Sequence, residues 1–174
     1  MIKRFAFAGA AALLAMSSPA PAHQSALTAA EIAHIAYTAG HLDVTAANQA
    51  LERSTNAEVR AFAETMARDH QAVNAQALAL LERLGVTPQP HATSAALTTQ
   101  AEQEARRLAA LDGAAFDRAY AEREAAYHAA VNEALRGTLI PAAHNAELKA
   151  LLEAGLALFT AHQDHAEALV RQLR

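Results

Sequence analysis

Hydrophobic residues recur with a helical period along most of the chain. Apolar positions three and four residues apart alternate with polar ones, Gly and Pro fall almost only between the periodic stretches, and runs of β-branched residues are missing. Short turns between helices favour antiparallel neighbours, so we expect an all-α, up-down four-helix bundle with an additional or kinked helical segment around residues 94–113. The predicted helices cover residues 28–53, 55–84, 94–111, 114–136 and 145–173.

Two capping patterns place the starts of the first two helices. Thr28 with Glu31, and Thr55 with Glu58, each form the T-x-x-E pattern of a capping box. Gly85 supplies the left-handed residue that commonly ends a helix, and two Pro residues follow it closely. The stretch after Gly85 is therefore the one clear linker of the predicted bundle.

Later helix boundaries have weaker signals. Thr93 or Ser94 can cap the next helix, and the sequence Leu111-Asp112-Gly113 predicts either a kink or a break. Gly137 is expected to end the following segment, after which Pro141 turns the chain into the last helix.

The first residues have the pattern of a secretory signal peptide. Lys3 and Arg4 precede an apolar run over residues 5–16, and the sequence up to Ala22 has small residues in the A-x-A arrangement of a cleavage site. The run is too short to span a bilayer. We expect an exported, periplasmic protein that is cleaved near Ala22-His23. The predicted division is a signal peptide over 1–22, a short tail over 23–27 and a helical domain over 28–174.

Composition narrows the partners that this chain is expected to have. It has no Cys, so a bound metal must be held by His, carboxylate or Met. Its net charge is −4 and its 14 Lys and Arg are scattered, which is unlike a nucleic-acid-binding surface. We therefore expect a metal ion as partner, no nucleic acid, and no transmembrane segment in the mature chain. Protein partners and a homo-oligomer stay open.

Six polar residues lie on the apolar faces of the predicted helices, where a plain core would use Leu or Ala. A buried carboxylate or imidazole is costly unless a partner or a metal satisfies it. Pairs three or four residues apart on one helix can reach the same ion. The pattern therefore predicts one or two transition-metal ions, of iron, copper or zinc. The six residues are Asp43, His70, Glu124, His128, His162 and His165.

Other candidate ligands have simpler interpretations. Met66 lies one turn before His70, where it either adds a thioether ligand or fills the core. His34 and His41 share the polar face of the first helix and are expected to be solvated. His23 would become the mature N-terminus, where it either chelates copper with the free amine or belongs to a disordered tail.

Several motifs carry a resemblance to a known family. The motifs are NAEVRAFA over 56–63, MARDH over 66–70, Leu108, LDG over 111–113 and FDRAY over 116–120, with His128 and His162 matching later His positions. With these motifs the chain resembles, over roughly residues 28–172, the exported bacterial family called domain of unknown function 4142. The resemblance implies a ferritin-like helical fold. The family pattern usually has Glu where this chain has the shorter Asp43.

Three kinds of function are compatible with the sequence. A metal-binding bundle would be an oxidase or peroxide scavenger if its ion were iron or manganese with an open position. A non-catalytic envelope or stress-related protein would use the same residues as a metal-free polar network. A helical module that binds a protein partner is the third. The effect of acid on stability distinguishes the first two. Metal ligands must be unprotonated, so a metal-loaded bundle should lose its ion and its stability in acid, whereas an ion-paired network is expected to be stabilised by charged His.

Overall fold

The computed structural model describes residues 26–174. The predicted signal peptide, its cleavage site and His23 lie outside these residues. Five long helices are joined by short connections, and a π-helical turn and a single helical turn follow the fourth of them. In chain order the elements are α1 (Ala29–Arg53), α2 (Ala57–Leu84), α3 (Ala92–Ala109), α4 (Gly113–Ala134), η1 (Leu135–Leu139), α5 (Ile140–Ala142) and α6 (Ala146–Gln172).

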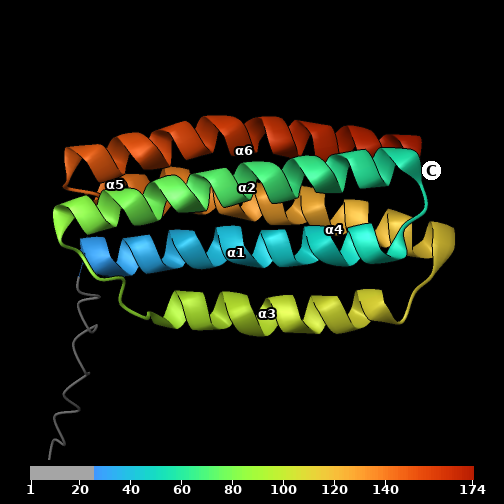
Figure 1. Ribbon diagram of the computed structural model, residues 1–174, viewed down its shortest axis with the longest axis horizontal. Coiled ribbons are helices and arrows are strands. Elements are labelled where there is room, and N and C mark those ends of the chain that lie inside the picture. The colour runs from blue at the N-terminus through green and yellow to red at the C-terminus, as the bar shows by residue number, and fades with distance from the viewer. Residues whose placement is uncertain (1–25) are drawn as a thin grey trace, which may run out of the picture.

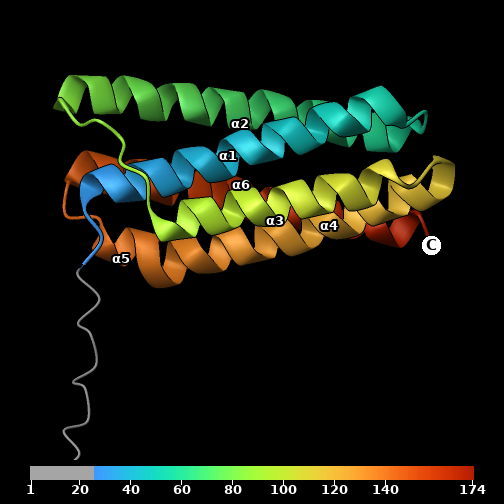
Figure 2. The ribbon, with the colours of Figure 1, turned by 90° about the horizontal axis from the view of Figure 1, so that it is seen from below.

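The five long helices form one bundle. Each runs opposite to the one before it in the chain (Figure 1). The most extensive packing joins α1 to α2 and α4 to α6, and α2 also packs on α6. The remaining helix, α3, lies against α1 and α4 (Figure 2) and covers the side of the bundle where those two helices touch little. The predicted all-α bundle is confirmed, and α3 is its additional segment.

Capping side chains explain where the helices begin. Thr28 caps α1 with the predicted capping box. The cap of α2 is Asn56 rather than Thr55, because the Asn56 side chain accepts hydrogen bonds from two backbone N–H groups of the first turn. The cap of α3 is His91, whose ring nitrogen accepts from the backbone of Thr93. The predicted cap of α2 was therefore wrong by one residue, and the predicted cap of α3, Thr93 or Ser94, was wrong by two or three.

The structure decides the two uncertain helix boundaries, at residues 111–113 and at Gly137, in different ways. Of the kink or break predicted at residues 111–113, the structure has the break, because Gly113 takes the left-handed φ of 53° and the chain reverses there. Gly137 does not end a helix. The π-helical turn η1 carries the helix through Gly137, and Pro141 lies in the first turn of α5, where its missing N–H is not needed. The result is a kinked helix from α4 to α5.

The core consists of two apolar clusters with a buried polar layer between them. Phe62, Met66 and Tyr120 belong to the first cluster, and Ile32 and Leu152 to the second. On α1, α2, α4 and α6 the residues of one cluster are followed by buried polar residues and then by residues of the other cluster. The layer contains Asp43, His70, Arg123, Glu124, His128, Asn132 and His162. Within residues 26–174, none of the helices is long and apolar enough to span a membrane.

Candidate metal centre

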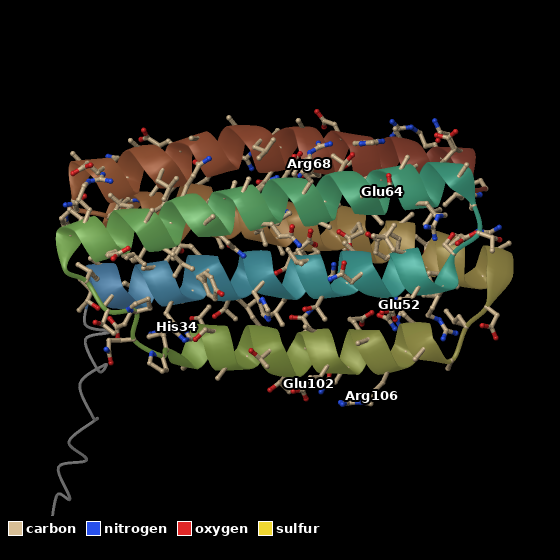
Figure 3. The ribbon with its side chains drawn as sticks, viewed as in Figure 1. His34, Glu52, Glu64, Arg68, Glu102 and Arg106 are labelled. Carbon is tan, nitrogen blue, oxygen red and sulfur yellow. The ribbon has the colours of Figure 1, made fainter. Side chains whose placement is uncertain are left out.

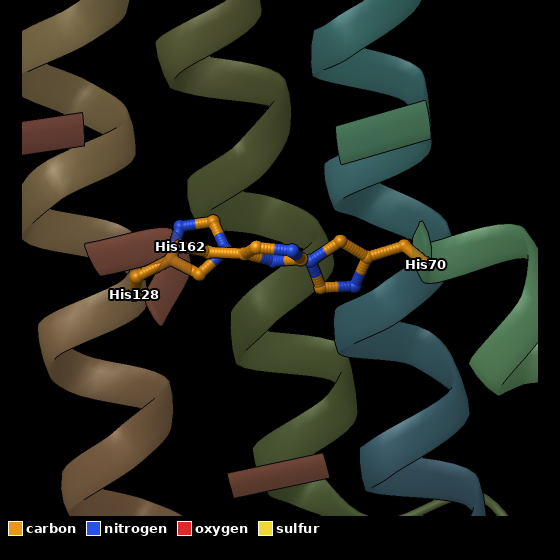
Figure 4. A group of neighbouring side chains, drawn as sticks. All are labelled: His70, His128 and His162. Atoms are coloured by element: carbon orange, nitrogen blue, oxygen red, sulfur yellow. The ribbon is translucent and has the colours of Figure 1, made fainter. Parts of the chain in front are cut away.

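Three buried imidazoles meet in the polar layer. His70 comes from α2, His128 from α4 and His162 from α6, and their rings converge from three sides (Figure 4). One ring nitrogen of each lies within 4.8 Å of the others. The Nε2 atoms of His70 and His128 are 3.3 Å apart, which is long for a hydrogen bond. Three nitrogens at this spacing can act as ligands of one ion.

Hydrogen bonds to the outer nitrogens set the tautomers of two of these rings. Nδ1 of His128 lies 3.0 Å from the backbone carbonyl of Glu124, so it donates there and leaves Nε2 free. Nε2 of His162 donates to Oδ2 of Asp69 at 3.0 Å, and Arg68 in turn donates to the other oxygen of that carboxylate. Nδ1 of His162 is buried without a hydrogen-bond partner. Such outer partners orient metal-ligating His and raise its basicity.

The ring of His70 is held by stacking rather than by a hydrogen-bonded carbonyl. It lies parallel to Phe159, with 4.5 Å between ring centroids and 7° between planes. Oδ2 of Asp43 is 3.2 Å from Nε2 of His70, close enough for an ion pair but without hydrogen-bond alignment. That oxygen therefore lies beside the three-histidine group, where it could serve as a further metal ligand.

A second group in the layer already contains a cation. Asp43, Glu124 and His128 each place a ligand atom within 4.8 Å of the others. Arg123 donates to Oδ1 of Asp43 at 3.1 Å and also donates to Oε1 of Glu124. Its guanidinium lies over the ring of Tyr127, 4.3 Å from the centroid. The two carboxylates therefore share a buried Arg, and His128 belongs to both groups.

Burial separates the pKa values of the two carboxyl groups. Although burial by itself raises the pKa of Asp43, His70, His128 and Arg123 outweigh it and hold that pKa at about 2. Burial raises the pKa of Glu124 well above its ordinary value, and the Asp43 charge adds to this against the opposing effect of Arg123. The surroundings therefore favour the charged form of Asp43, whereas burial and the Asp43 charge favour the protonated form of Glu124.

The imidazoles of His70 and His128 are kept uncharged at neutral pH. Burial lowers the pKa of His70 to about 4, even though the nearby Asp43 raises it. Burial also lowers the pKa of His128. The expectation that a metal-free network gains stability from charged His is wrong for these two residues, because desolvation outweighs the carboxylates. Neutral imidazole is also the form that binds metal.

The stability that a neutral, buried His70 contributes to the metal-free protein should therefore be lost in acid. Unfolded His70 takes up a proton near pH 6.5 and folded His70 only near pH 4, so between these values the unfolded state binds more protons. For His70 alone the loss is about 3 kcal/mol on going from pH 6.5 to pH 4. Urea unfolding of wild type and His70→Gln over this range measures it. A difference in unfolding free energy that does not change with pH would contradict a neutral buried His70.

The remaining candidate residues lie elsewhere. His165 is exposed and contacts the edge of Phe62, with 5.0 Å between ring centroids, so the structure does not bring it into either group. His34 is half-buried and its Nδ1 lies 2.9 Å from Oγ of Ser94, on the side of α1 that faces α3 (Figure 3). The expectation that His34 is solvated was wrong, because α3 covers it. His41 is exposed, as expected.

Two residues of the centre were missed at the sequence level. Arg123 is not among the predicted site residues, yet Phe116 and Tyr120 lie seven and three residues before it and Tyr127 lies four residues after it. Those spacings put Arg123 on a stripe of large aromatic residues, and this stripe was the available signal. Asp69 has no such signal, because its contact with His162 depends on how α2 and α6 pack.

Comparison with known proteins gives the family. The model of the family described as "Domain of unknown function (DUF4142)" matches residues 14–169. The chain belongs to this family. The DUF4142 match spans every residue of both groups, so the resemblance found in the sequence motifs is confirmed. No curated protein and no solved structure matches the chain.

Proposed function

We propose that this DUF4142 protein binds one transition-metal ion in its core through His70, His128 and His162. The observation that carries the proposal is the convergence of three buried imidazoles from three helices. A group of buried imidazoles is costly without partners, and Nδ1 of His162, the ring nitrogen left free by the bond to Asp69, has none among the described residues.

The donor set fits a particular class of ion. Imidazole ligands suit zinc, copper, iron and nickel, and the chain has no Cys to offer. In a tetrahedral zinc site with bonds of about 2.0–2.1 Å, two nitrogens lie about 3.3 Å apart. Nε2 of His70 and Nε2 of His128 are separated by 3.3 Å. A fourth position is then left for Asp43, water or a substrate.

The number of ions follows from Arg123. A second metal at Asp43 and Glu124 would have to displace or approach the guanidinium that these carboxylates already bind. Like charges at such distances repel strongly in a buried site. We therefore assign one ion to the three-histidine group, with the carboxylate group as its polar surroundings.

The wider setting of the site is also part of the proposal. The pattern of residues 1–22 supports export with cleavage near Ala22-His23, into the periplasm. A ferritin-like arrangement is supported by the crossover through α3, which connects α2 to α4 in the chain and runs along the outside of the bundle (Figure 1). Because of that crossover, α2 and α4 run in the same direction.

A metal-free structural role is the second candidate, and specific contacts favour it. Arg123 already pairs with two carboxylates, and Asp69 already accepts from His162. In that case the polar layer would only fix how the helices align, without chemistry.

Metal content decides between the two candidates. The mature protein, purified without an affinity tag or chelator, should contain about one equivalent of a transition metal by elemental mass spectrometry. His162→Gln should lose most of it, whereas His165→Gln, an exposed His on the same helix, should keep it. Metal-free wild-type protein that takes up no zinc, copper or iron on dialysis would leave the structural role. Equal metal in both variants would place the ion elsewhere.

A further inference from the structure

A cavity of about 400 Å³ lies beside the polar layer. It is lined by residues of all five long helices, with His70 and His128 in its wall. It extends from those two imidazoles along the second apolar cluster, toward Leu148 and Leu152 on α6. Exposed residues of α3 and α4 also line it, so it reaches the surface on the side that α3 covers.

Small residues create this space. Ala36, Gly40, Ala77 and Gly155 line the cavity at positions where larger side chains would fill it. Gly40 also allows close approach of α1 and α2, because a Cβ there would collide with the side chain of Asn74. Protein interiors are close-packed and rarely hold voids much larger than a water molecule. The volume is instead in the range of ligand pockets, roughly 300–1,000 Å³.

The wall selects for a neutral and mainly apolar ligand. Most of it is aliphatic or aromatic. Among its charged residues, Arg123 is neutralised by Asp43 and Glu124. Arg107 and Glu104 pair with each other at 2.8 Å near the mouth, and Glu122 faces solvent. No charged group in the described wall is thus both buried and unpaired.

One end of the cavity differs from the rest. His70 and His128 face it from the polar layer, and Tyr127 lies beside them with its hydroxyl donating to the carbonyl of Ala39. We propose that the cavity binds a neutral organic molecule with an apolar body and one polar end, the polar end lying toward His70 and His128. This ligand site does not require the proposed metal, because the side chains of the protein alone form the cavity.

Binding of 1-decanol to the metal-free protein, measured by calorimetry, tests this. Wild type should bind at one site, and decanoate, which differs in charge, should bind about tenfold more weakly. Ala77→Phe and Ala36→Phe fill the cavity from two helices and should each weaken decanol binding by about tenfold or more. Ala79→Phe, exposed on α2 and outside the cavity, should bind like wild type.

Two further readouts keep the outcomes distinct. Thermal unfolding followed by circular dichroism shows whether each Phe variant is folded, and either lining variant suffices if the other is not. Nuclear Overhauser contacts should join the C1 protons of decanol to the ring protons of His70 or His128. The proposal is overturned by absence of decanol binding to wild type up to its solubility limit. Equal binding by the folded lining variants and Ala79→Phe, or decanoate binding as tight as decanol, also overturns it.

Discussion

Arg123→Met should lower the free energy of unfolding by about 3–5 kcal/mol in metal-free protein at neutral pH. Met keeps much of the length and apolar surface that pack on Tyr127 but removes the charge. Asp43 is fully buried, and it would then be an ionised carboxylate without its guanidinium partner. Removing one member of a buried ion pair costs more than the pair itself contributes, because the remaining charge stays desolvated. Urea unfolding followed by circular dichroism measures this loss.

Arg106→Met is the matched control for Arg123→Met. Arg106 is exposed on the outer side of α3, where it pairs with Glu102 at 3.8 Å (Figure 3). An exposed pair of this kind contributes about 0–1 kcal/mol. Adding Asp43→Asn to Arg123→Met should recover part of the loss, because the unpaired charge is then removed. Equal costs for Arg123→Met and Arg106→Met would show that the buried carboxylates do not need the guanidinium.

Zinc should stabilise the folded protein by about 4 kcal/mol at a thousandfold excess over its dissociation constant. The expectation follows from the proposed function, since an ion that binds only the folded chain shifts the unfolding equilibrium by mass action. His128→Gln should abolish the effect, because His128 lies in the three-histidine group and next to both carboxylates. His41→Gln, at an exposed position on α1, should leave it unchanged.

The zinc effect is measured by urea unfolding with added zinc and again after excess chelator. Zinc-induced stabilisation of equal size in His128→Gln and wild type would assign binding to surface histidines. Zinc that leaves the unfolding of wild type unchanged would contradict the proposed centre directly.

Much of the fold follows from local rules that a single sequence contains. The period of about 3.6 residues in apolar positions identifies which face of each helix is inward. It placed Asp43, His70 and His162 on inward faces, and the structure buries all three. Capping is more difficult to predict, as Thr55 shows, because several neighbouring side chains compete for the same orphan N–H groups and only one geometry wins.

Contacts between helices depend on quantities that the period does not contain. His165 follows His162 by three residues, yet a rotation of about 60° carries it to the edge of Phe62 and to solvent. The position of α3 is set by how its sparse apolar face fits α1 and α4, so the burial of His34 could not be inferred. The aromatic stripe on α4 could have indicated that Arg123 is buried, but its pairing with Asp43 depends on how α1 and α4 pack.

His128 takes part in both groups of the polar layer, with Nε2 toward His70 and Nδ1 toward Glu124. A change of charge in either group therefore changes the electrostatic energy of the other, because the two groups are close together in a region of low dielectric constant. Free energies measured for single substitutions in this layer will not add, and a cycle of single and double variants is needed to apportion them. In thermodynamic terms the layer is one cooperative unit, and its proton uptake belongs to the set rather than to any member.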